Sequence, residues 1–473
     1  MANDAISFEL RRGEILALLG ENGAGKTTLM NILFGHYVAD EGTIEVFGKP
    51  IAAGSPRAAI AAGIGMVHQH FTLADNLTVL DNIVLGTESL WKPASGRAEA
   101  RRRIRELGRE FGLEVEPDAT VATLSVGERQ RVEILKALYR KASILILDEP
   151  TAVLTPAESQ ALFRTLRKLV DGGLSVILIS HKLAEVMASS DRVMVLRAGR
   201  LVAGRAVGET SREELAELMV GRAVEAPTLA PREPGELRFE LAGSSFRSDD
   251  GRVLVDNANL ALRHGEIVGI AGVSGNGQTS LADFIGRMNA SLGKYVAHIP
   301  EDRHGQGLIV DMSVAENAVS ERYRDPAFGR MGLMRWPAIT SFAEKLIAEY
   351  DIRCSGPAAA VRDLSGGNMQ KLLIARVLSR APDLVIANQP TRGLDVGAVA
   401  FVHAQLIAAR DRGAALLVIS EDLDELLAIS DRIAVMYRGR LSAALPRKEI
   451  SIAKLGLMMA GHGFPDTGAA DAA

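Results

Sequence analysis

The sequence has little of what marks a secreted, membrane-spanning or nucleic-acid-binding protein. Its 473 residues include one cysteine, which excludes disulfides and cysteine-clustered metal sites. No uninterrupted apolar run approaches the ~18 residues of a membrane helix. The charges nearly balance, with 54 Lys and Arg against 58 Asp and Glu, so no overall basic field exists to hold nucleic acid. The first residues, MANDAISFELRRGE, also lack the basic and apolar regions of a secretory signal. We therefore expect a cytoplasmic protein.

The same ordered set of short segments occurs twice in the chain. RRGEILALLGENGAGKTTL (residues 11–29) matches RHGEIVGIAGVSGNGQTSL (residues 263–281) at an offset of 252. Residues 122–154 match residues 362–394 at an offset of 240. A repeat of this length predicts two domains of one fold.

The repeat and the composition between its copies predict the domain boundaries. Between the halves, APTLAPREPGE has three prolines within eight residues, which suits a short extended linker. We assign residues 1–225 to the first domain, 226–235 to the linker, 236–462 to the second domain and 463–473 to a disordered tail. In each half, aliphatic runs such as EILALLG and LSVILIS alternate with helical stretches. This alternation predicts an α/β fold with a mostly parallel, buried sheet.

A glycine-rich loop in the first half indicates a phosphate-binding site. Residues 20–27, GENGAGKT, fit the pattern G-x-x-x-x-G-K-[ST] between an apolar strand and a helix. Backbone N–H groups of such a loop surround phosphates. Lys26 would contact the β- and γ-phosphates, while the Thr27 hydroxyl and Asp148, at the end of a second apolar strand, would hold Mg²⁺. Glu149 is placed to polarise the attacking water.

Further motifs narrow the class of nucleotide-binding protein. LSVGE (residues 124–128) and LSGGN (residues 364–368) each lie about 20 residues before an apolar strand, the one that ends at Asp148 and the one that ends at Asn388. His181 follows the next apolar strand of the first half. With these motifs in order over nearly the whole chain, the sequence resembles the ATP-binding-cassette (ABC) ATPases. The resemblance implies two P-loop NTPase cassettes in tandem, each with a mostly parallel sheet core and a helical subdomain. It also implies that Gln69 is the Q-loop residue and a Mg²⁺ ligand, and that His181 is the switch histidine facing the γ-phosphate.

The second half departs from the family pattern at its catalytic positions. Gln278 stands in place of Lys26, and Glu421 stands in place of His181. The carboxylate pair of the first half is replaced by Asn388 and Gln389. An amide lacks the charge of lysine and cannot accept a proton from water. We therefore expect the second cassette to hydrolyse ATP poorly.

In this family two cassettes close head to tail, so each nucleotide lies between the P-loop of one and the signature motif of the other. The resemblance thus implies one hydrolytic site and one degenerate site, with Asp395 as the D-loop residue of the hydrolytic site. The nucleotide-binding residues expected for the hydrolytic site are Gly20, Glu21, Asn22, Gly23, Ala24, Gly25, Lys26, Thr27, Thr28, Ser365, Gly366, Gly367 and Asn368. Its catalytic residues are Glu149, His181 and Gln69, and its metal ligands are Thr27, Gln69 and Asp148. The degenerate site would collect Gly272, Gly275, Gly277, Gln278, Thr279, Asn388, Gln389, Glu421, Ser125 and Gly127.

The fused pair looks like the tandem ATP-binding subunit of sugar-type ABC importers. GMVHQHF (residues 65–71) and IPEDRH (residues 299–304) look most similar to the nucleoside-importing branch, with ribose- or galactose-type import as the alternative. The resemblance implies ATP and Mg²⁺ as cofactors and two integral-membrane permease subunits as partners. An extracytoplasmic substrate-binding protein would act indirectly, and no nucleic acid is expected. The surface near Gln69 and Glu301 would contact the permease from the cytoplasmic face of the inner membrane.

The alignment of the two halves has two gaps. At offset 252, Met1 aligns with Val253, so residues 236–252 have no counterpart, and we expect the first cassette to lack its N-terminal strand. Lys26 and Gln69 are 43 positions apart, whereas Gln278 and Glu301 are 23 apart. The second cassette should therefore have a shortened β arm.

Two other classes of function remain open. A non-transport tandem cassette protein usually keeps both sites intact and carries a long charged linker or zinc-binding cysteines, which this sequence lacks. A nucleotide-binding protein without turnover is the other alternative, because the missing N-terminal strand would remove the usual adenine-stacking aromatic.

Overall fold

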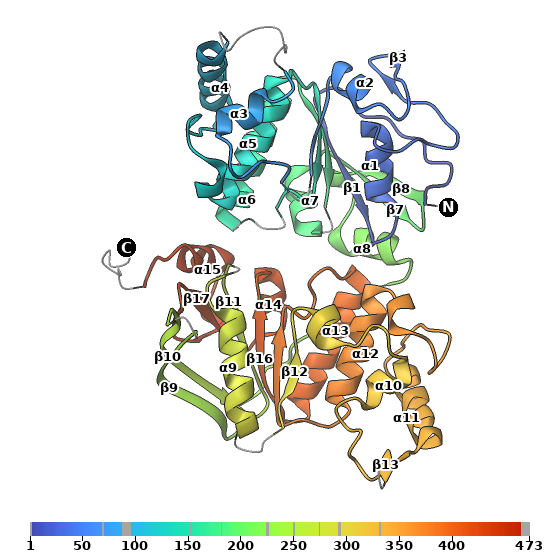
Figure 1. The fold of residues 1–473 in the computed structure, drawn as a ribbon, viewed down its shortest axis with the longest axis vertical. Helices are drawn as coiled ribbons and strands as arrows, with labels where there is room; N and C mark the ends of the chain where they lie inside the picture. The colour runs from blue at the N-terminus through green and yellow to red at the C-terminus, as the bar shows by residue number, and fades with distance from the viewer. Residues whose placement is uncertain are drawn as a thin grey trace. The chain divides into compact units, whose positions relative to one another are not determined.

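The computed structural model describes residues 2–68, 71–87, 96–151, 154, 156–180, 182–223, 227–248, 251–273, 275–291, 295–330 and 333–464. The chain divides into two compact units, Met1–Val224 and Glu225–Ala473. Each unit has its own central sheet with helices on both faces (Figure 1). None of the helices within the described ranges has the length and hydropathy of a bilayer-spanning segment.

The first unit is built on a six-stranded sheet in the order β4-β5-β6-β1-β7-β8. All neighbouring strands are parallel except β7 and β8. These strands are β1 (Ile15–Gly20), β4 (Ile64–Val67), β5 (Ile144–Asp148), β6 (Ser175–Ile179), β7 (Arg192–Arg197) and β8 (Arg200–Ala206). Every residue of β1 and β6 is buried, as expected for aliphatic strands covered on both faces.

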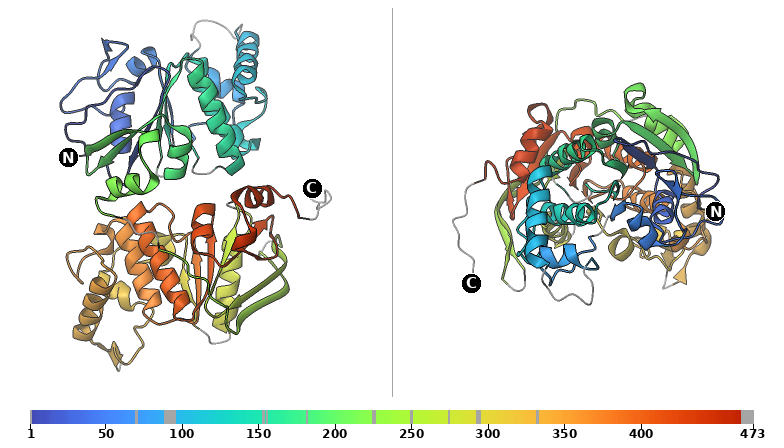
Figure 2. Two further views of the ribbon diagram at one scale, coloured as in Figure 1. Left: turned by 180° about the vertical axis from the view of Figure 1, so that it is seen from behind. Right: turned by 90° about the horizontal axis from the view of Figure 1, so that it is seen from above.

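The helices of the first unit lie on opposite sides of this sheet, with α1 and α2 on one side and α4, α5 and α6 on the other (Figures 1 and 2). Two buried clusters fill the two interfaces, one around Leu29 and Met30 and one around Leu135 and Leu166. The helices are α1 (Lys26–Phe34), α2 (Pro56–Ala61), α3 (Val79–Val84), α4 (Arg97–Phe111), α5 (Val126–Tyr139), α6 (Pro156–Asp171), α7 (Leu183–Ser189) and α8 (Arg212–Val220). A short hairpin, β2 (Glu45–Val46) and β3 (Lys49–Pro50), lies between α1 and α2 in the chain.

The second unit repeats this sheet in the order β12-β15-β16-β11-β17-β18, with β19 also paired to β17. Its strands are β9 (Leu237–Arg247), β10 (Val253–Arg263), β11 (Glu266–Ala271), β12 (Ala297–Ile299), β13 (Gly329–Arg330), β14 (Leu333–Met334), β15 (Leu384–Asn388), β16 (Ala415–Ser420), β17 (Arg432–Tyr437), β18 (Arg440–Leu441) and β19 (Leu445–Pro446). Its helices are α9 (Gln278–Ser291), α10 (Val314–Val319), α11 (Trp336–Glu349), α12 (Gly366–Leu378), α13 (Val396–Asp411), α14 (Leu423–Ile429) and α15 (Ile452–Met459). The shared strand order confirms the predicted tandem α/β fold.

The two units differ before their first central strand. In the second unit β9 and β10 form an antiparallel pair, whereas residues 2–14, all of which the structure describes, form no strand. These residues nevertheless occupy the place of β10. The Asp4 N–H donates to the Gly199 carbonyl over 2.7 Å, and the Asp256 N–H donates to the Gly439 carbonyl over 2.8 Å.

The shortened arm of the second unit is also visible. In the first unit, α1 ends at Phe34 and is followed by the β2–β3 hairpin. In the second unit, α9 is longer, extending from Gln278 to Ser291, and β12 follows at Ala297 with no strand among the described residues between them. The predicted shortening of the β arm in the second cassette is therefore confirmed.

Candidate nucleotide site

The glycine-rich loop of the first unit connects β1 to α1 at the carboxyl end of the sheet. Gly23 and Gly25 have φ values of 83° and 97°, which favour glycine. A Cβ on Gly25 would lie 2.5 Å from the Ala2 carbonyl oxygen, so a side chain there would displace the N-terminal segment. Beside Gly23, by contrast, a Cβ would meet no atom within 4 Å. The loop is thus packed on one side and open on the other.

Lys26 begins α1 and is buried. Its ammonium donates to the Gly20 carbonyl over 2.7 Å and to the Glu21 carbonyl over 3.0 Å. Burial lowers the pKa of Lys26, while the nearby carboxylates of Glu149 and Asp148 act to raise it. The cation therefore lies at the loop, facing two acidic groups.

Asp148 and Glu149 have different environments although they are neighbours. Asp148 is the last residue of β5 and is buried. Burial, followed by the charge of Glu149, raises the pKa of Asp148 to about 6, against the opposing effect of Lys26. Glu149 is half-buried and has a φ of 47°, and its N–H donates to the Ile179 carbonyl over 2.9 Å. Left-handed backbone at a non-glycine residue persists where surrounding contacts fix it.

This set of groups fits a nucleoside triphosphate with Mg²⁺. The open side of the loop would receive the phosphates, with Lys26 and the start of α1 as the positive groups. Thr27 is exposed and would hold Mg²⁺ together with Asp148. The described residues contain no cluster of three or more His, Cys, Asp or Glu side chains that could hold a metal by themselves. Mg²⁺ commonly binds through one or two protein groups plus substrate phosphates.

The raised pKa of Asp148 predicts a pH-dependent gain in stability on Asp148→Asn. Ionisation of Asp148 costs the folded state free energy, so this carboxyl stabilises folding most below pH 3.8 and loses that contribution as the pH rises through about 6. Asparagine does not titrate. We expect Asp148→Asn to stabilise the metal-free chain by about 1 to 3 kcal/mol above pH 6 and by progressively less towards pH 4. Urea unfolding at pH 8 and pH 4.5 measures this, and an equal effect at both pH values would contradict it.

The equivalent loop of the second unit keeps the shape and loses the charges. Gln278 is buried like Lys26, and its amide donates to the Val273 carbonyl over 2.9 Å. Asn388, at the end of β15, donates its amide N–H to the Thr279 hydroxyl over 3.3 Å. The Gln389 N–H donates to the Ile419 carbonyl over 2.8 Å, and its side-chain oxygen accepts from the Glu421 N–H. Neutral amides thus replace one cation and two carboxylates.

The two signature motifs lie at the starts of α5 and α12. Ser125 caps α5, and its hydroxyl donates to the Glu128 carboxylate over 2.8 Å. Ser365 caps α12, where the Asn368 amide donates to its hydroxyl over 2.9 Å. Serine hydrogen bonds lower the pKa of Glu128, so the first signature carries a stable negative charge that the second lacks.

Two further predicted residues are not described, and a third caps a helix of the second unit. Gln69 and His181 lie outside the described residues. Asp395 caps α13, where its carboxylate accepts from the Ala398 N–H over 2.7 Å. Within the first unit Lys26, Asp148 and Glu149 lie close together, since the charges of Asp148 and Glu149 act to raise the pKa of Lys26, and the charges of Glu149 and Lys26 act in opposite directions on the pKa of Asp148.

Glu301 lies in a network that the sequence did not indicate. It forms an ion pair with Arg392. The neighbouring Arg303 donates to the Gly366 carbonyl over 3.2 Å and also to the Arg392 carbonyl. Asp302 begins the short helix of residues 303–307. The segment around Glu301 is thus tied to the second signature motif.

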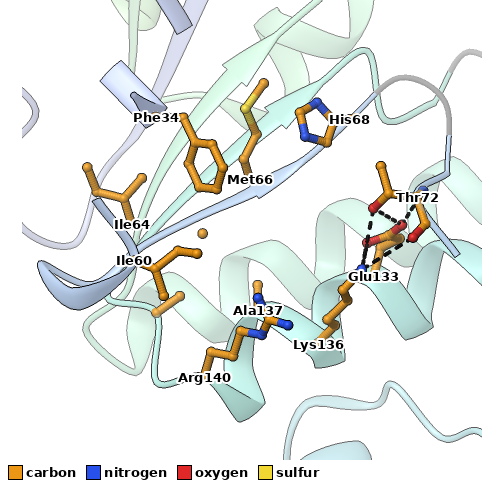
Figure 3. A pocket seen from close by; sticks show the side chains of 12 residues that line it. Phe34, Ile60, Ile64, Met66, His68, Thr72, Glu133, Lys136, Ala137 and Arg140 are labelled. Carbon is orange, nitrogen blue, oxygen red and sulfur yellow. Dashed lines mark hydrogen bonds and ion pairs between the residues drawn. The ribbon is translucent and has the colours of Figure 1, made fainter. Parts of the chain in front are cut away.

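A pocket of about 200 Å³ in the first unit was also not predicted. Apolar side chains from α1, α2 and β4 converge on one end of it, while Lys136 of α5 and Arg140, which directly follows α5, line the opposite wall (Figure 3). At its polar end, Glu133 accepts hydrogen bonds from the backbone and hydroxyl of Thr72. His68 also lines the pocket, and burial lowers its pKa. This surface is a cleft with an apolar floor, one basic wall and the Glu133 carboxylate at its polar end.

Residues 3–152 and 255–392 match the family model described as ABC transporter. The chain belongs to the ABC transporter family. It is 45% identical to the nucleoside import ATP-binding protein NupA of Lactococcus lactis subsp. cremoris, over 98% of this chain and 95% of that protein. It is 43% identical to the guanosine import ATP-binding protein NupO of Bacillus subtilis, over 100% and 96% of the two chains.

A third relative is the ribose import ATP-binding protein RbsA 1 of Rubrobacter xylanophilus, 40% identical over 98% of this chain and 95% of that protein. A solved structure of an RNase-L inhibitor is similar in fold, with a TM-score of 0.62 and 20% identity, covering 93% of this chain and 88% of that chain. The resemblance to tandem subunits of sugar-type importers is confirmed, and this ABC protein is an ATPase.

Proposed function

We propose that this ABC protein energises the import of nucleosides through a separate permease, using one hydrolytic ATP site in its first cassette. The observation that supports the site most is the joint placement of Lys26, Asp148 and Glu149, with amides at all three equivalent positions of the second unit. Two nucleoside-import proteins among the relatives support the substrate class.

The charged residues of the first cassette have distinct roles in this proposal. Lys26 binds the phosphates and stabilises negative charge that develops on them. Asp148 and Thr27 hold Mg²⁺, which when bound would neutralise phosphate charge. Glu149 orients the attacking water and accepts its proton, which an amide cannot do. Gln69 and His181 would complete the site as the Q-loop and switch residues.

The second cassette has a different role in the same proposal. Replacing an ammonium by an amide removes a charge-assisted contact of roughly 1.5–3 kcal/mol. The Thr279 hydroxyl, which corresponds to Thr27, already accepts from Asn388. A weak or structural nucleotide site follows, so hydrolysis occurs in the first cassette alone.

In this proposal the protein lies at the cytoplasmic face of the plasma membrane, bound to two permease subunits. An extracytoplasmic substrate-binding protein delivers the substrate to those subunits. Substrate choice then belongs to those partners. The experiment is uptake by proteoliposomes that contain the chain, both permease subunits and the binding protein, with labelled uridine, guanosine, ribose and galactose. ATP-dependent uptake of the nucleosides alone is expected. Uptake of ribose or galactose instead would show that the protein energises sugar import. Absence of ATP-dependent uptake of all four compounds would refute the import function.

The pocket of the first unit is the surface we assign to the permease. Its apolar floor suits a short apolar helix, and its Lys136 and Arg140 suit acidic residues at that helix's edge. Ile60→Asp would place a charge on the floor. We expect this variant to bind ATP normally while ATP-driven uptake falls at least about ten-fold, because burying an unpaired charge at the interface is unfavourable.

Arg57→Asp is the matched control for this variant. Arg57 lies on the same helix, α2, is exposed, and does not line the pocket. If both substitutions reduced uptake equally, the pocket would not be the contact surface.

A further inference from the structure

A glutamate that accepts hydrogen bonds from a threonine and a serine recurs in each unit, half-buried in the first and buried in the second. Glu185 lies on α7 of the first unit and Glu425 lies on α14 of the second, 240 positions later. Each follows the central strand that leads to the switch position, which is residue 181 in one half and Glu421 in the other. Both units therefore have this glutamate, although the residues proposed for hydrolysis in the first unit are replaced in the second.

Glu185 accepts hydrogen bonds from two loops that meet behind the site. The Thr151 hydroxyl donates to Glu185 Oε2 over 2.6 Å, and the Ser180 hydroxyl lies 3.4 Å from the same oxygen. The Lys182 ammonium lies 3.3 Å from Oε1. Thr151 and Ser180 are both buried, so Glu185 supplies an acceptor to hydroxyl groups that have little access to water.

Glu425 has the same two kinds of partner in the second unit. The Thr391 hydroxyl donates to Oε1 over 2.8 Å, and the Ser420 hydroxyl donates to Oε2. His403 Nε2 lies 3.1 Å from Oε1. The second unit thus contains the same junction without a carboxylate pair in front of it.

The Glu185 junction links the segment that follows the proposed general base to the end of the neighbouring strand, β6. Thr151 lies two residues after Glu149, whose left-handed backbone is held by the N–H bond to the Ile179 carbonyl. The Leu154 N–H donates to the Thr151 carbonyl over 3.2 Å. Ser180 directly follows Ile179. A carboxylate that binds both hydroxyls therefore fixes the loop of Glu149 against the end of β6.

We propose that Glu185 is a positioning residue for ATP hydrolysis, which acts through Thr151 and Ser180 to hold the Glu149 carboxylate at the attacking water. This rests on the proposed function, in which Glu149 acts in the one hydrolytic site. Glu425 makes the equivalent junction in a unit whose loop carries Gln389, so it supports folding without affecting turnover.

Thr151→Val tests the junction, because valine has the shape of threonine and lacks its hydroxyl. We expect kcat for ATP hydrolysis to fall about ten-fold, with the KM for ATP within two-fold of wild type, since the glycine-rich loop is unchanged. Thr151→Ser retains the hydroxyl and should restore kcat to within about two-fold. Glu185→Ala should lower kcat at least as much as Thr151→Val.

Thr391→Val is the matched control, because it removes the same bond from the second unit. It should lower the Tm about as much as Thr151→Val and change kcat less than two-fold. If Thr391→Val lowers kcat as much as Thr151→Val, or if Thr151→Ser fails to restore it, the junction is only structural and the proposal is overturned.

Hydrogen exchange separates this proposal from the assignment of the hydrolytic site. Thr151→Val should speed amide exchange at Glu149 and Leu154 at least about ten-fold, and Thr391→Val should not. This readout needs no turnover, so it applies even if the wild type hydrolyses ATP elsewhere or not at all. Unchanged exchange at both amides in Thr151→Val would overturn the positioning role.

Discussion

Lys26→Ala should lower ATP hydrolysis by the permease-bound protein at least about a hundred-fold, whereas Gln278→Ala should lower it less than two-fold. Lys26 supplies the buried cation of the first cassette, whereas Gln278 supplies only an amide. Loss of one preorganised group that stabilises developing charge costs about 3–4 kcal/mol in the transition state, and each 1.36 kcal/mol is a factor of ten. Steady-state Mg²⁺-dependent phosphate release measures both rates.

Lys26→Gln distinguishes the loss of charge from damage to the loop. The second unit shows that an amide fits this position, because Gln278 lies buried and bonds the Val273 carbonyl of its own loop. The glutamine variant should therefore keep the Tm of the wild type and lose nearly as much activity as the alanine variant. Equal loss of activity in Lys26→Gln and Gln278→Ala would show that both cassettes hydrolyse ATP, contrary to the single-site proposal.

The parts of the site predictable from sequence are those that lie in one short segment. The loop that ends at Lys26 and Thr27 has its glycines, its strand and its helix within about 20 consecutive residues. Asp148 ends an aliphatic strand that could be recognised by composition, and β5 indeed ends there. The internal repeat helped further, because each replaced residue of the second half could be compared with the functional residue at the equivalent position of the first.

The parts not predictable depend on side chains that meet only in the folded unit. Thr151 and Glu185 are 34 positions apart, one in the loop after β5 and the other on α7. The signal for them was present, because Thr391 and Glu425 repeat them at the same offset of 240, but threonine and glutamate are common and suggest no chemistry alone. The bond from Asn388 to Thr279 joins residues 109 positions apart. The raised pKa of Asp148 arises from burial, which a sequence motif does not describe.

Glu149→Gln should lower turnover at least about a hundred-fold while ATP still binds. The second unit shows why the loop tolerates the change, because Gln389 has a φ of 49° and bonds the Ile419 carbonyl, as Glu149 bonds the Ile179 carbonyl. The amide cannot take a proton from water. Single-turnover hydrolysis measured beside equilibrium binding of a fluorescent ATP analogue separates the two effects.

Glu149→Gln should also change the pKa of Asp148. This effect on ATP binding and the effect on turnover together test the role of Glu149. The charge of Glu149 is the second cause, after burial, of the raised pKa of Asp148. Its removal should lower that pKa, so Mg²⁺-dependent ATP binding should persist to lower pH in Glu149→Gln than in the wild type. Gln389→Glu is the control: it adds a carboxylate where Gln278 and Asn388 remain, and should add no turnover. Full activity in Glu149→Gln would refute the general-base role. If turnover is lost while ATP binding persists to lower pH, the Glu149 carboxylate is needed for the reaction of water and not for binding of the nucleotide.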